Sequence, residues 1–233
     1  MVKGPTYQNM TKEARAVTAE VLAPSGSYAD QAYELVRDRL VMLDIRPGEP
    51  IDDDRLATEL GFGRTPVREA LKRLERERLV VAFPRRGTFA TAVDMTDLAD
   101  ISEIRKQLEP LAAARAARTA SADVRARLTA LAEEIPTFDD GEGPKELLRK
   151  DVRVHREIYR AASNPYLEDI LVSLDSHATR IWCLFLDRLP GVSDHVQEHV
   201  ALLKAIVAGD EDTAAALTLA HIEGFEQAIR KIL

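Results

Sequence analysis

The chain has 233 residues, of which 45% are hydrophobic and 30% are charged, an ordinary composition for a globular protein with room for two domains. We expect neither a membrane span nor secretion, because the sequence has no run of about 18 apolar residues and its first residues lack the apolar core of a signal peptide. A single cysteine, Cys183, excludes an internal disulfide framework and is typical of a protein in the reducing cytoplasm.

The formal net charge of −7 is divided unevenly along the chain. Residues 27–91 carry 12 basic and 12 acidic side chains, whereas residues 92–233 carry 17 basic and 25 acidic ones. Within the first segment, residues 64–86 hold eight basic side chains against three acidic ones. Such a patch attracts phosphate, so the overall acidity does not exclude a nucleic-acid-binding protein.

The N-terminal residues precede the first predicted helix. Residues 1–26 show little sustained periodicity and end in the sequence Pro-Ser-Gly, which predicts a flexible N-terminal arm to which we assign no function. Apolar residues at helical spacing then predict a helix from about Tyr28 to Leu43, stopped by Arg-Pro-Gly. We expect this helix to pack under the elements that follow it.

Two short helices and a hairpin are predicted next. Residues 53–60 place apolar side chains at helical spacing behind a run of aspartates that can cap a helix, and a glycine-rich break follows. A second, basic helix opens at Thr65 with Pro66 in its first turn, and residues 79–83 and 88–91 form two strands. A solvated amphipathic helix beside an ordinary hairpin is the alternative. The order of elements instead favours a winged helix-turn-helix over residues 27–91, with the second helix entering the major groove.

The sequences GFGRTPVREAL, from Gly61, and RRGTF, from Arg85, resemble the winged helix of GntR-type bacterial transcriptional regulators. Two positions depart from the family's pattern: Gly63 stands where serine or threonine is usual, and Arg78 stands where glycine is usual. The first removes a capping hydroxyl and the second adds a positive charge, so we expect an altered operator preference. The resemblance implies DNA contact by Arg64, Thr65 and Arg68 on the recognition helix, by Gly87 at the wing tip in the minor groove, and by Arg55 and Arg86 at phosphates.

Beyond residue 91 every segment has the three-to-four-residue apolar spacing of a helix. Asp94, Ser121 and Ser193 are the expected N-caps. This half therefore predicts an all-helical bundle over residues 92–233, and the fold class of the whole chain is mainly α. The six expected helices span residues 94–118, 121–134, 146–162, 165–188, 193–208 and 210–233.

Three histidines and one aspartate fall on the apolar faces of these helices. Asp151 and His155 lie one turn apart on one helix, and His199 and His221 lie on two others. Any one of these histidines alone would be an ordinary core residue, but an unpaired carboxylate and three unpaired imidazoles are costly to bury together. We therefore predict that the four bind a divalent metal ion, with zinc as the first choice and nickel, manganese or iron as alternatives. His195 falls at the edge of its apolar face and is left outside this set.

Two further polar residues are candidates for contact with an effector. Arg105 shares an apolar arc with Glu109 one turn on, so it forms either an internal ion pair or an anchor that offers its planar guanidinium to a ligand carboxylate. His177 lies at the margin of its helix's apolar arc and either lines a cavity or has a plain core or surface role.

The helical half carries a set of spaced motifs: Arg105-x-x-x-Glu109, Asp151-x-x-x-His155, Asn164, Glu198-His199 with Gly209-Asp210, and His221. Together they resemble the all-helical ligand-binding domain of the FadR-like branch of the family, often called FCD. The resemblance implies a metal held by the four predicted ligands, a small organic acid completing its coordination, and Arg105 anchoring that acid. Members that respond to fatty acyl groups lack the metal set, so the resemblance favours a small carboxylate over acyl-CoA.

These features together predict a homodimeric, ligand-responsive transcriptional regulator whose helical half serves for effector binding and dimerisation. One recognition helix contacts few base pairs, so two are expected on a near-palindromic double-stranded DNA operator. Repression relieved by ligand is the default expectation for this family. Two alternatives stay open: a metal-dependent hydrolase, for which no general base beyond Asp151 and Glu109 is evident, and a regulator whose metal is purely structural.

Overall fold

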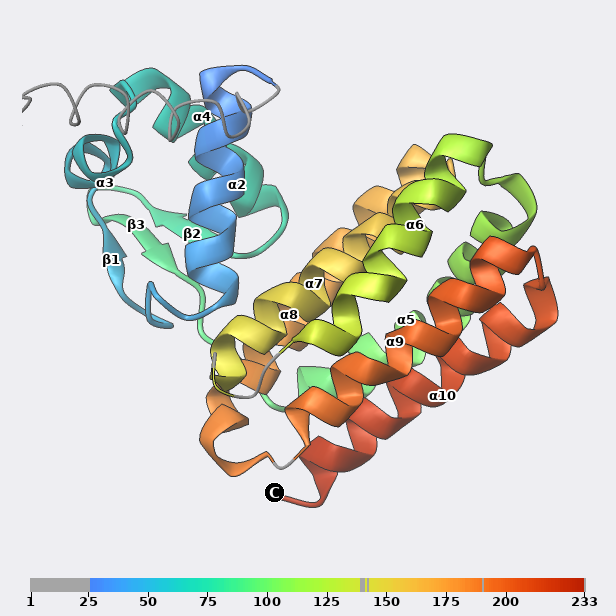
Figure 1. Ribbon diagram of the computed structural model, residues 1–233. Coiled ribbons are helices and arrows are strands. Elements are labelled where there is room, and N and C mark those ends of the chain that lie inside the picture. Colours follow the sequence, from blue (N-terminus) through green and yellow to red (C-terminus); the bar gives the residue numbers. More distant parts are fainter. Residues whose placement is uncertain (1–25, 139–140, 142, 190, 233) are drawn as a thin grey trace, which may run out of the picture.

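The computed structural model describes residues 26–138, 141, 143–189 and 191–232. A small unit of helices and strands lies beside a bundle of longer helices (Figure 1). The predicted mainly α class, with a winged helix-turn-helix followed by a helical bundle, is confirmed. The predicted N-terminal arm lies, except for Gly26, outside the described residues. None of the described helices is both long and apolar enough to cross a membrane.

The first described helix, α2 (Tyr28–Val41), supports the recognition helix from below. It starts with a capping box, in which the Ser27 hydroxyl accepts a hydrogen bond from the backbone N–H of Asp30, at 3.2 Å, and the Asp30 carboxylate accepts one from the backbone N–H of Ser27. Its buried face packs against α4, as predicted. The core between these helices is aliphatic: Ala32, Val36, Leu40, Val67, Ala70, Leu71 and Leu74.

The helix-turn-helix consists of α3 (Asp53–Leu60) and α4 (Arg64–Arg76). The Asp52 carboxylate caps α3 by accepting from the backbone N–H of Asp54 at 2.9 Å, and Gly61 ends α3 in the left-handed conformation with φ 71°. Gly63 is the N-cap of α4, and no side-chain capping bond is found there among the described residues. This agrees with the expectation that a glycine at this position removes a capping hydroxyl.

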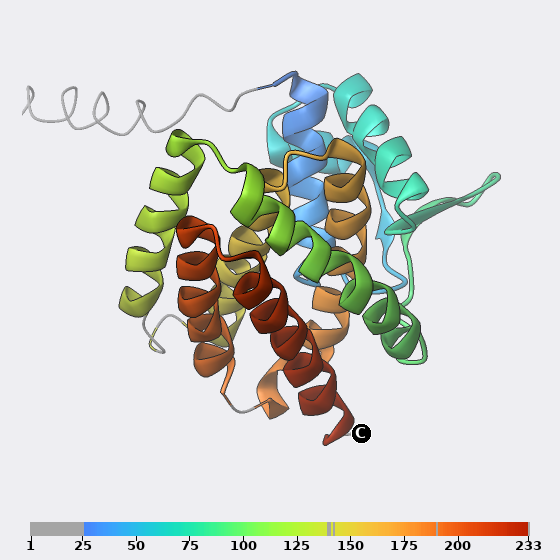
Figure 2. The same cartoon turned by 90° about the vertical axis from the view of Figure 1, so that its right-hand side faces the viewer.

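The wing is an antiparallel sheet of three strands in the order β1-β3-β2. Strands β2 (Val80–Phe83) and β3 (Gly87–Ala90) form the predicted hairpin, which projects from the body of the protein (Figure 2). Strand β1 (Pro50–Ile51) pairs with β3 and was not predicted, because two residues are too short to show a period of two.

The bundle consists of the six predicted helices: α5 (Asp97–Thr119), α6 (Ala122–Glu134), α7 (Pro144–Ala161), α8 (Pro165–Phe185), α9 (Val192–Ala208) and α10 (Glu211–Arg230). Short 3-10 turns, η1 (Ile135–Thr137) and η3 (Leu186–Arg188), follow α6 and α8. Helix α5 packs against α7, α8, α9 and α10, and α7 and α9 each likewise pack against four of the other bundle helices.

One of the three predicted N-caps is confirmed and two are wrong. Ser121 caps α6 by accepting from the backbone N–H of Val124, at 3.3 Å. Asp94 lies before α5, whose N-cap is Thr96, and its carboxylate accepts from the backbone N–H of Thr96 at 2.9 Å. Ser193 lies inside the first turn of α9, because Gly191 takes the left-handed conformation and lets the helix begin earlier.

Polar contacts join the two parts of the molecule. Arg180 of α8, which is only 1% exposed, donates to the Thr91 hydroxyl at 2.8 Å and to the Thr91 carbonyl at 2.6 Å, just after β3. Arg149 of α7 pairs with Asp44 at 2.7 Å, beyond the end of α2. The linker after the wing is therefore held against the bundle.

Arg125 joins the ends of three bundle helices. Its guanidinium donates to the carbonyls of Ala117 at 2.7 Å, of Ala120 at 3.1 Å and of Ile206 at 2.9 Å, which lie at the ends of α5 and α9. Carbonyls in the last turn of a helix have no partner within the helix, so a basic side chain stabilises them.

We predict that Arg125→Met lowers the free energy of unfolding by about 2–3 kcal/mol, because several charge-assisted hydrogen bonds are lost and methionine keeps most of the side-chain volume. Urea denaturation followed by circular dichroism measures this. Arg127→Met, on the exposed face of the same helix, is the matched control. Equal midpoints for the two variants would contradict the role assigned to Arg125.

The second residue after the end of α4, Arg78, gives another prediction. Arg78 has φ 59°, in the left-handed region that glycine adopts without strain. We predict that Arg78→Gly raises the free energy of unfolding by roughly 1 kcal/mol. Arg78→Ala removes the same charge but retains the strained φ, so it should show no such gain in urea denaturation. A glycine variant no more stable than the alanine variant would disprove the strain.

Candidate metal centre and DNA-binding surface

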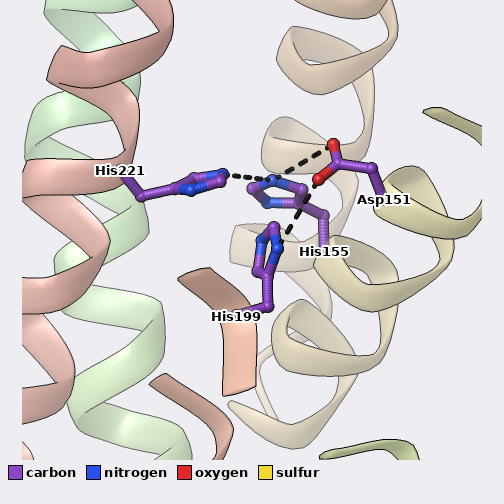
Figure 3. A group of neighbouring side chains, drawn as sticks. All are labelled: Asp151, His155, His199 and His221. Atoms are coloured by element: carbon purple, nitrogen blue, oxygen red, sulfur yellow. Dashed lines mark hydrogen bonds and ion pairs between the residues drawn. The ribbon is translucent and has the colours of Figure 1, made fainter. Parts of the chain in front are cut away.

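The four predicted metal ligands come together in the bundle core. Asp151 and His155 project from α7, His199 from α9 and His221 from α10, and all four point toward one another (Figure 3). Each offers one ligand atom within 4.8 Å of the others. His155 Nε2 lies 3.2 Å from His221 Nε2 and 3.7 Å from Asp151 Oδ2, and all four residues are buried.

The Nδ1 atom of each imidazole has a partner outside this cluster. His221 Nδ1 lies 2.8 Å from the Glu198 carboxylate, His155 Nδ1 lies 3.1 Å from the Tyr159 hydroxyl, and His199 Nδ1 lies 3.2 Å from the Val196 carbonyl. Partners of this kind fix the ring orientation and tautomer of metal-binding histidines. In a neutral ring whose proton is held at Nδ1, Nε2 has a lone pair that a metal can accept.

Two buried atoms of the cluster lack a hydrogen-bond partner. Among the described residues none is found for His199 Nε2 or for Asp151 Oδ1. Buried polar atoms are rarely left unpaired, because the loss of hydration is not compensated. A cation coordinated by these atoms would remove the deficit, and three imidazole nitrogens with one carboxylate suit zinc and related divalent ions. The donor set therefore fits a divalent metal.

The four residues of the cluster differ in their protonation. Burial, with a contribution from neighbouring imidazoles, holds the pKa of His199 and of His221 well below its usual value, so both rings are neutral. Burial raises the pKa of Asp151 to about 7. Burial opposes the charge on His155, but the carboxylates of Asp151 and Glu109 raise its pKa to about 9. A metal would compete with the proton held by this acid and base.

Arg105 forms an internal ion pair with Glu109, which was one of the two roles expected for it. It is 4% exposed, pairs with Glu109 and lies 3.6 Å from Asp175 Oδ1. Glu109 Oε2 lies in turn 3.4 Å from Nδ1 of His155, one of the four predicted metal ligands. Arg105 is thus adjacent to the metal cluster, and its contact with an effector stays a prediction.

His177 and His195 lie outside the cluster of four. His177 is at the junction of the two parts of the molecule, where Nε2 is 2.8 Å from the Glu77 carbonyl and the side chain borders a cavity that winged-helix residues also line. The structure therefore does not group His177 with Arg105. His195 stacks on His221, with ring centroids 3.9 Å apart.

Sequence reasoning missed Asp175 as part of this network. It is buried on α8, 3% exposed, and faces Arg105. Its spacing from Leu171 and Ala178 places it on the apolar arc of its helix, which is the signal that singled out the histidines. The same test applied to carboxylates would have found it.

The six residues predicted to contact DNA lie on α3, on α4 and at the hairpin. Arg64 and Arg68 are exposed and lie in the first turns of α4 beside Thr65. Arg86 precedes Gly87 at the end of the hairpin, where Gly87 has φ 94° and an added Cβ would meet no described atom within 4 Å. This open backbone is compatible with close approach to a groove.

Carboxylates of α3 pair with the arginines of this surface. Arg64 Nε lies 2.6 Å from Asp54, Arg68 Nε lies 3.0 Å from Asp53, and Arg55 pairs with Glu59 at 2.7 Å within α3. Exposed ion pairs contribute little to stability, so DNA phosphates can replace these carboxylates at small cost.

Two family models match the chain. Residues 28–90 match the gntR family of bacterial regulatory proteins, and residues 100–224 match the FCD domain. The chain is 21% identical to the HTH-type transcriptional repressor RspR of Escherichia coli (strain K12) over 211 residues, which cover 91% of this chain and 92% of RspR. It is 29% identical to the Nta operon transcriptional regulator of Aminobacter aminovorans over 195 residues, which cover 83% and 90% of the two chains.

Solved structures support the same fold. E. coli McbR/YncC superposes with a TM-score of 0.77 at 21% identity, covering 89% of this chain and 99% of that one. A GntR regulator from Rhodococcus sp. RHA1 gives a TM-score of 0.67 at 20% identity, covering 89% and 100%. The relatives are transcriptional regulators and not enzymes, so the hydrolase alternative is set aside. The chain belongs to the GntR family of bacterial transcriptional regulators and carries an FCD domain.

Proposed function

We propose that this regulator is a homodimeric repressor whose affinity for its operator is set by a small carboxylate bound at a metal in the bundle. The observation that carries the proposal is the buried group of Asp151, His155, His199 and His221, in which two atoms lack a hydrogen-bond partner among the described residues. The name of RspR, a transcriptional repressor, supports the direction of regulation.

The four residues of that group would hold a divalent metal, with zinc as the first choice. Three imidazoles and a carboxylate leave such an ion able to accept a further oxygen ligand, which a small organic acid would supply. Arg105 would add positive charge beside it, if its pairing with Glu109 is loosened. His177 has no part in this site, because it contacts the Glu77 carbonyl at the domain junction.

Helix α7 connects the metal group to the winged helix. It carries Asp151 and His155, and Arg149 on the same helix pairs with Asp44 beyond the end of α2. A ligand can change DNA affinity only by binding one arrangement of the two domains more tightly than another. We infer that the carboxylate acts through α7 and the linker after β3, which Arg180 holds.

The winged helix would bind a near-palindromic operator in the cytoplasm, with two chains placing their α4 helices in successive major grooves. Arg64, Thr65 and Arg68 would contact bases or phosphates, Arg55 and Arg86 would contact phosphates, and Gly87 would approach the minor groove.

A second candidate is a regulator with a purely structural metal. The observation in its favour is that Arg105 already pairs with Glu109, and lies near Asp175, so it has no need of a ligand carboxylate. The first experiment below separates the two.

We predict that the purified protein contains about one metal ion per chain and that His199→Ala loses it, because one of the four ligands is removed. Metal content is measured by mass spectrometry, and thermal shift is recorded with acetate, malonate, succinate and citrate. At about 100 times its Kd, an acid that binds only the folded protein adds roughly 2.7 kcal/mol of stability. It should stabilise the wild type and not His199→Ala.

His177→Ala is the matched control, since it removes a histidine outside the cluster and should retain both metal and response. Metal without a response to any acid, together with unfolding on chelation, would support the structural candidate. A wild-type protein without bound metal would contradict both the effector-binding and the structural role of the metal.

Another prediction concerns the recognition helix, α4. Arg68→Ala should weaken binding to a duplex selected from random sequence, and should reduce the slope of log affinity against log salt by about 1, if Arg68 contacts a phosphate. Fluorescence anisotropy between 50 and 200 mM salt measures both, and a titration at high concentration shows whether two chains bind one duplex.

Arg118→Ala, on an exposed pair with Glu211 in the bundle, is the charge-matched control and should bind DNA as the wild type does. Equal affinities for Arg68→Ala and Arg118→Ala would exclude Arg68 from the DNA interface.

A further inference from the structure

A second polar site lies between the two parts of the molecule, apart from the metal group. It is a cavity of about 610 Å³ bounded by α2 and α4 on one side and by α7 and α8 on the other. We call it the arginine cavity, because six arginines line it: Arg37, Arg73, Arg76, Arg153, Arg156 and Arg160. Neither the metal ligands nor the residues predicted to contact DNA line it.

Four of these arginines have close carboxylate partners. Arg37 pairs with Glu34 and Arg160 with Glu157, both within the lining. Arg73 pairs with Asp30 at 2.7 Å, and Arg153 pairs with Glu134 at 2.8 Å, both outside it. The carboxylates nearest to these four guanidinium groups are therefore already engaged.

Arg76 and Arg156 have no close carboxylate partner of their own. The lining also contains Glu168, 3.8 Å from Arg160, and Asp169, so its six arginines exceed its carboxylates by one. The nearest carboxylate to Arg156 is Glu34, at 3.8 Å, and Arg37 already holds that group. No ion pair is found for Arg76 within the described part of the chain. Glu77, also in the lining, accepts a hydrogen bond from the Tyr33 hydroxyl at 2.7 Å. Like charges held close together in a partly closed site attract an anion.

Unpaired hydrogen-bond donors in the lining also favour an anion in the cavity. The Nε atoms of Arg37 and Arg156 are buried and have no hydrogen-bond acceptor among the described residues. Arg37 is only 5% exposed, so water has little access to that atom. A buried donor without an acceptor costs about 1–3 kcal/mol, more when the group is charged. An oxyanion in the cavity would supply acceptors to both arginines at once.

We propose that the arginine cavity binds a small molecule that carries a phosphate group. Guanidinium groups form paired hydrogen bonds with phosphate oxygens, and arginines from both domains surround the space. The volume lies in the range of small-molecule sites and exceeds what one phosphate ion fills. Because Arg73 and Arg76 belong to α4 whereas Arg153 and Arg156 belong to α7, the anion fixes the recognition helix against the bundle.

Inorganic phosphate is the first probe, titrated against the full-length protein and followed by isothermal calorimetry and thermal shift, with sodium chloride at matched ionic strength as the reference. We expect saturable binding to the wild type. Arg156→Gln and, separately, the exposed Arg76→Gln should each weaken it by at least about tenfold, the equivalent of one charge-assisted hydrogen bond. Arg118→Gln, which removes the same charge elsewhere on the bundle, should bind as the wild type does.

Phosphate that acts no differently from chloride would overturn the proposal, as would equal binding by all four proteins. Arg76→Gln decides the matter if Arg156→Gln does not fold, because the Arg76 side chain is exposed. A random-sequence duplex is titrated in parallel. If Arg156→Gln weakens duplex binding as much as phosphate binding, the residue serves the DNA backbone and the proposal fails.

Discussion

A buried ionisable side chain costs on the order of several kcal/mol unless its charge is neutralised and its hydrogen bonds are completed. The bundle buries a connected series of such groups, from Asp175 and Arg105 through Glu109 to His155 and Asp151. Their requirements fix how α5, α7 and α8 approach one another, and His199 and His221 extend them to α9 and α10. The packing of five helices therefore depends on one polar network, at whose end Asp151 Oδ1 and His199 Nε2 have no hydrogen-bond partner among the described residues.

The winged helix solves a different electrostatic problem. Its recognition surface must attract phosphate, yet residues 27–91 carry no net charge. The carboxylates of Asp53 and Asp54 lie beside Arg68 and Arg64 and neutralise them in the free protein. Since exposed ion pairs of this kind are weak, phosphates can displace them. The acidic start of α3 thus does not oppose DNA binding, and it limits the attraction of the free protein to other polyanions.

Local patterns predicted the helices and the four residues that cluster in the bundle core, because each of the four shares an apolar arc with its neighbours on one helix. Pairing across helices was beyond such patterns. The approach of Asp175 from α8 was therefore not foreseen, whereas the ion pair between Arg105 and Glu109, one turn apart on α5, could be weighed as an alternative. The position of His177 at the domain junction was not foreseen, because a marginal position on a helix does not tell which other element covers it. The N-caps at Asp94 and Ser193 were wrong since one residue of backbone, such as the left-handed Gly191, moves a helix start. The arginine cavity could not be seen at all, as it is formed by segments more than 70 residues apart.

Two consecutive residues of helix α7 belong to different sites. His155 is part of the candidate metal group, and Arg156 lines the arginine cavity. A rigid helix cannot turn one of these residues without turning the other. If both proposed ligands bind, occupancy of the two sites would be linked in a thermodynamic cycle, in which each ligand changes the affinity for the other by the same factor. The regulator would then respond to a combination of two chemical signals, and α7 would connect the two sites.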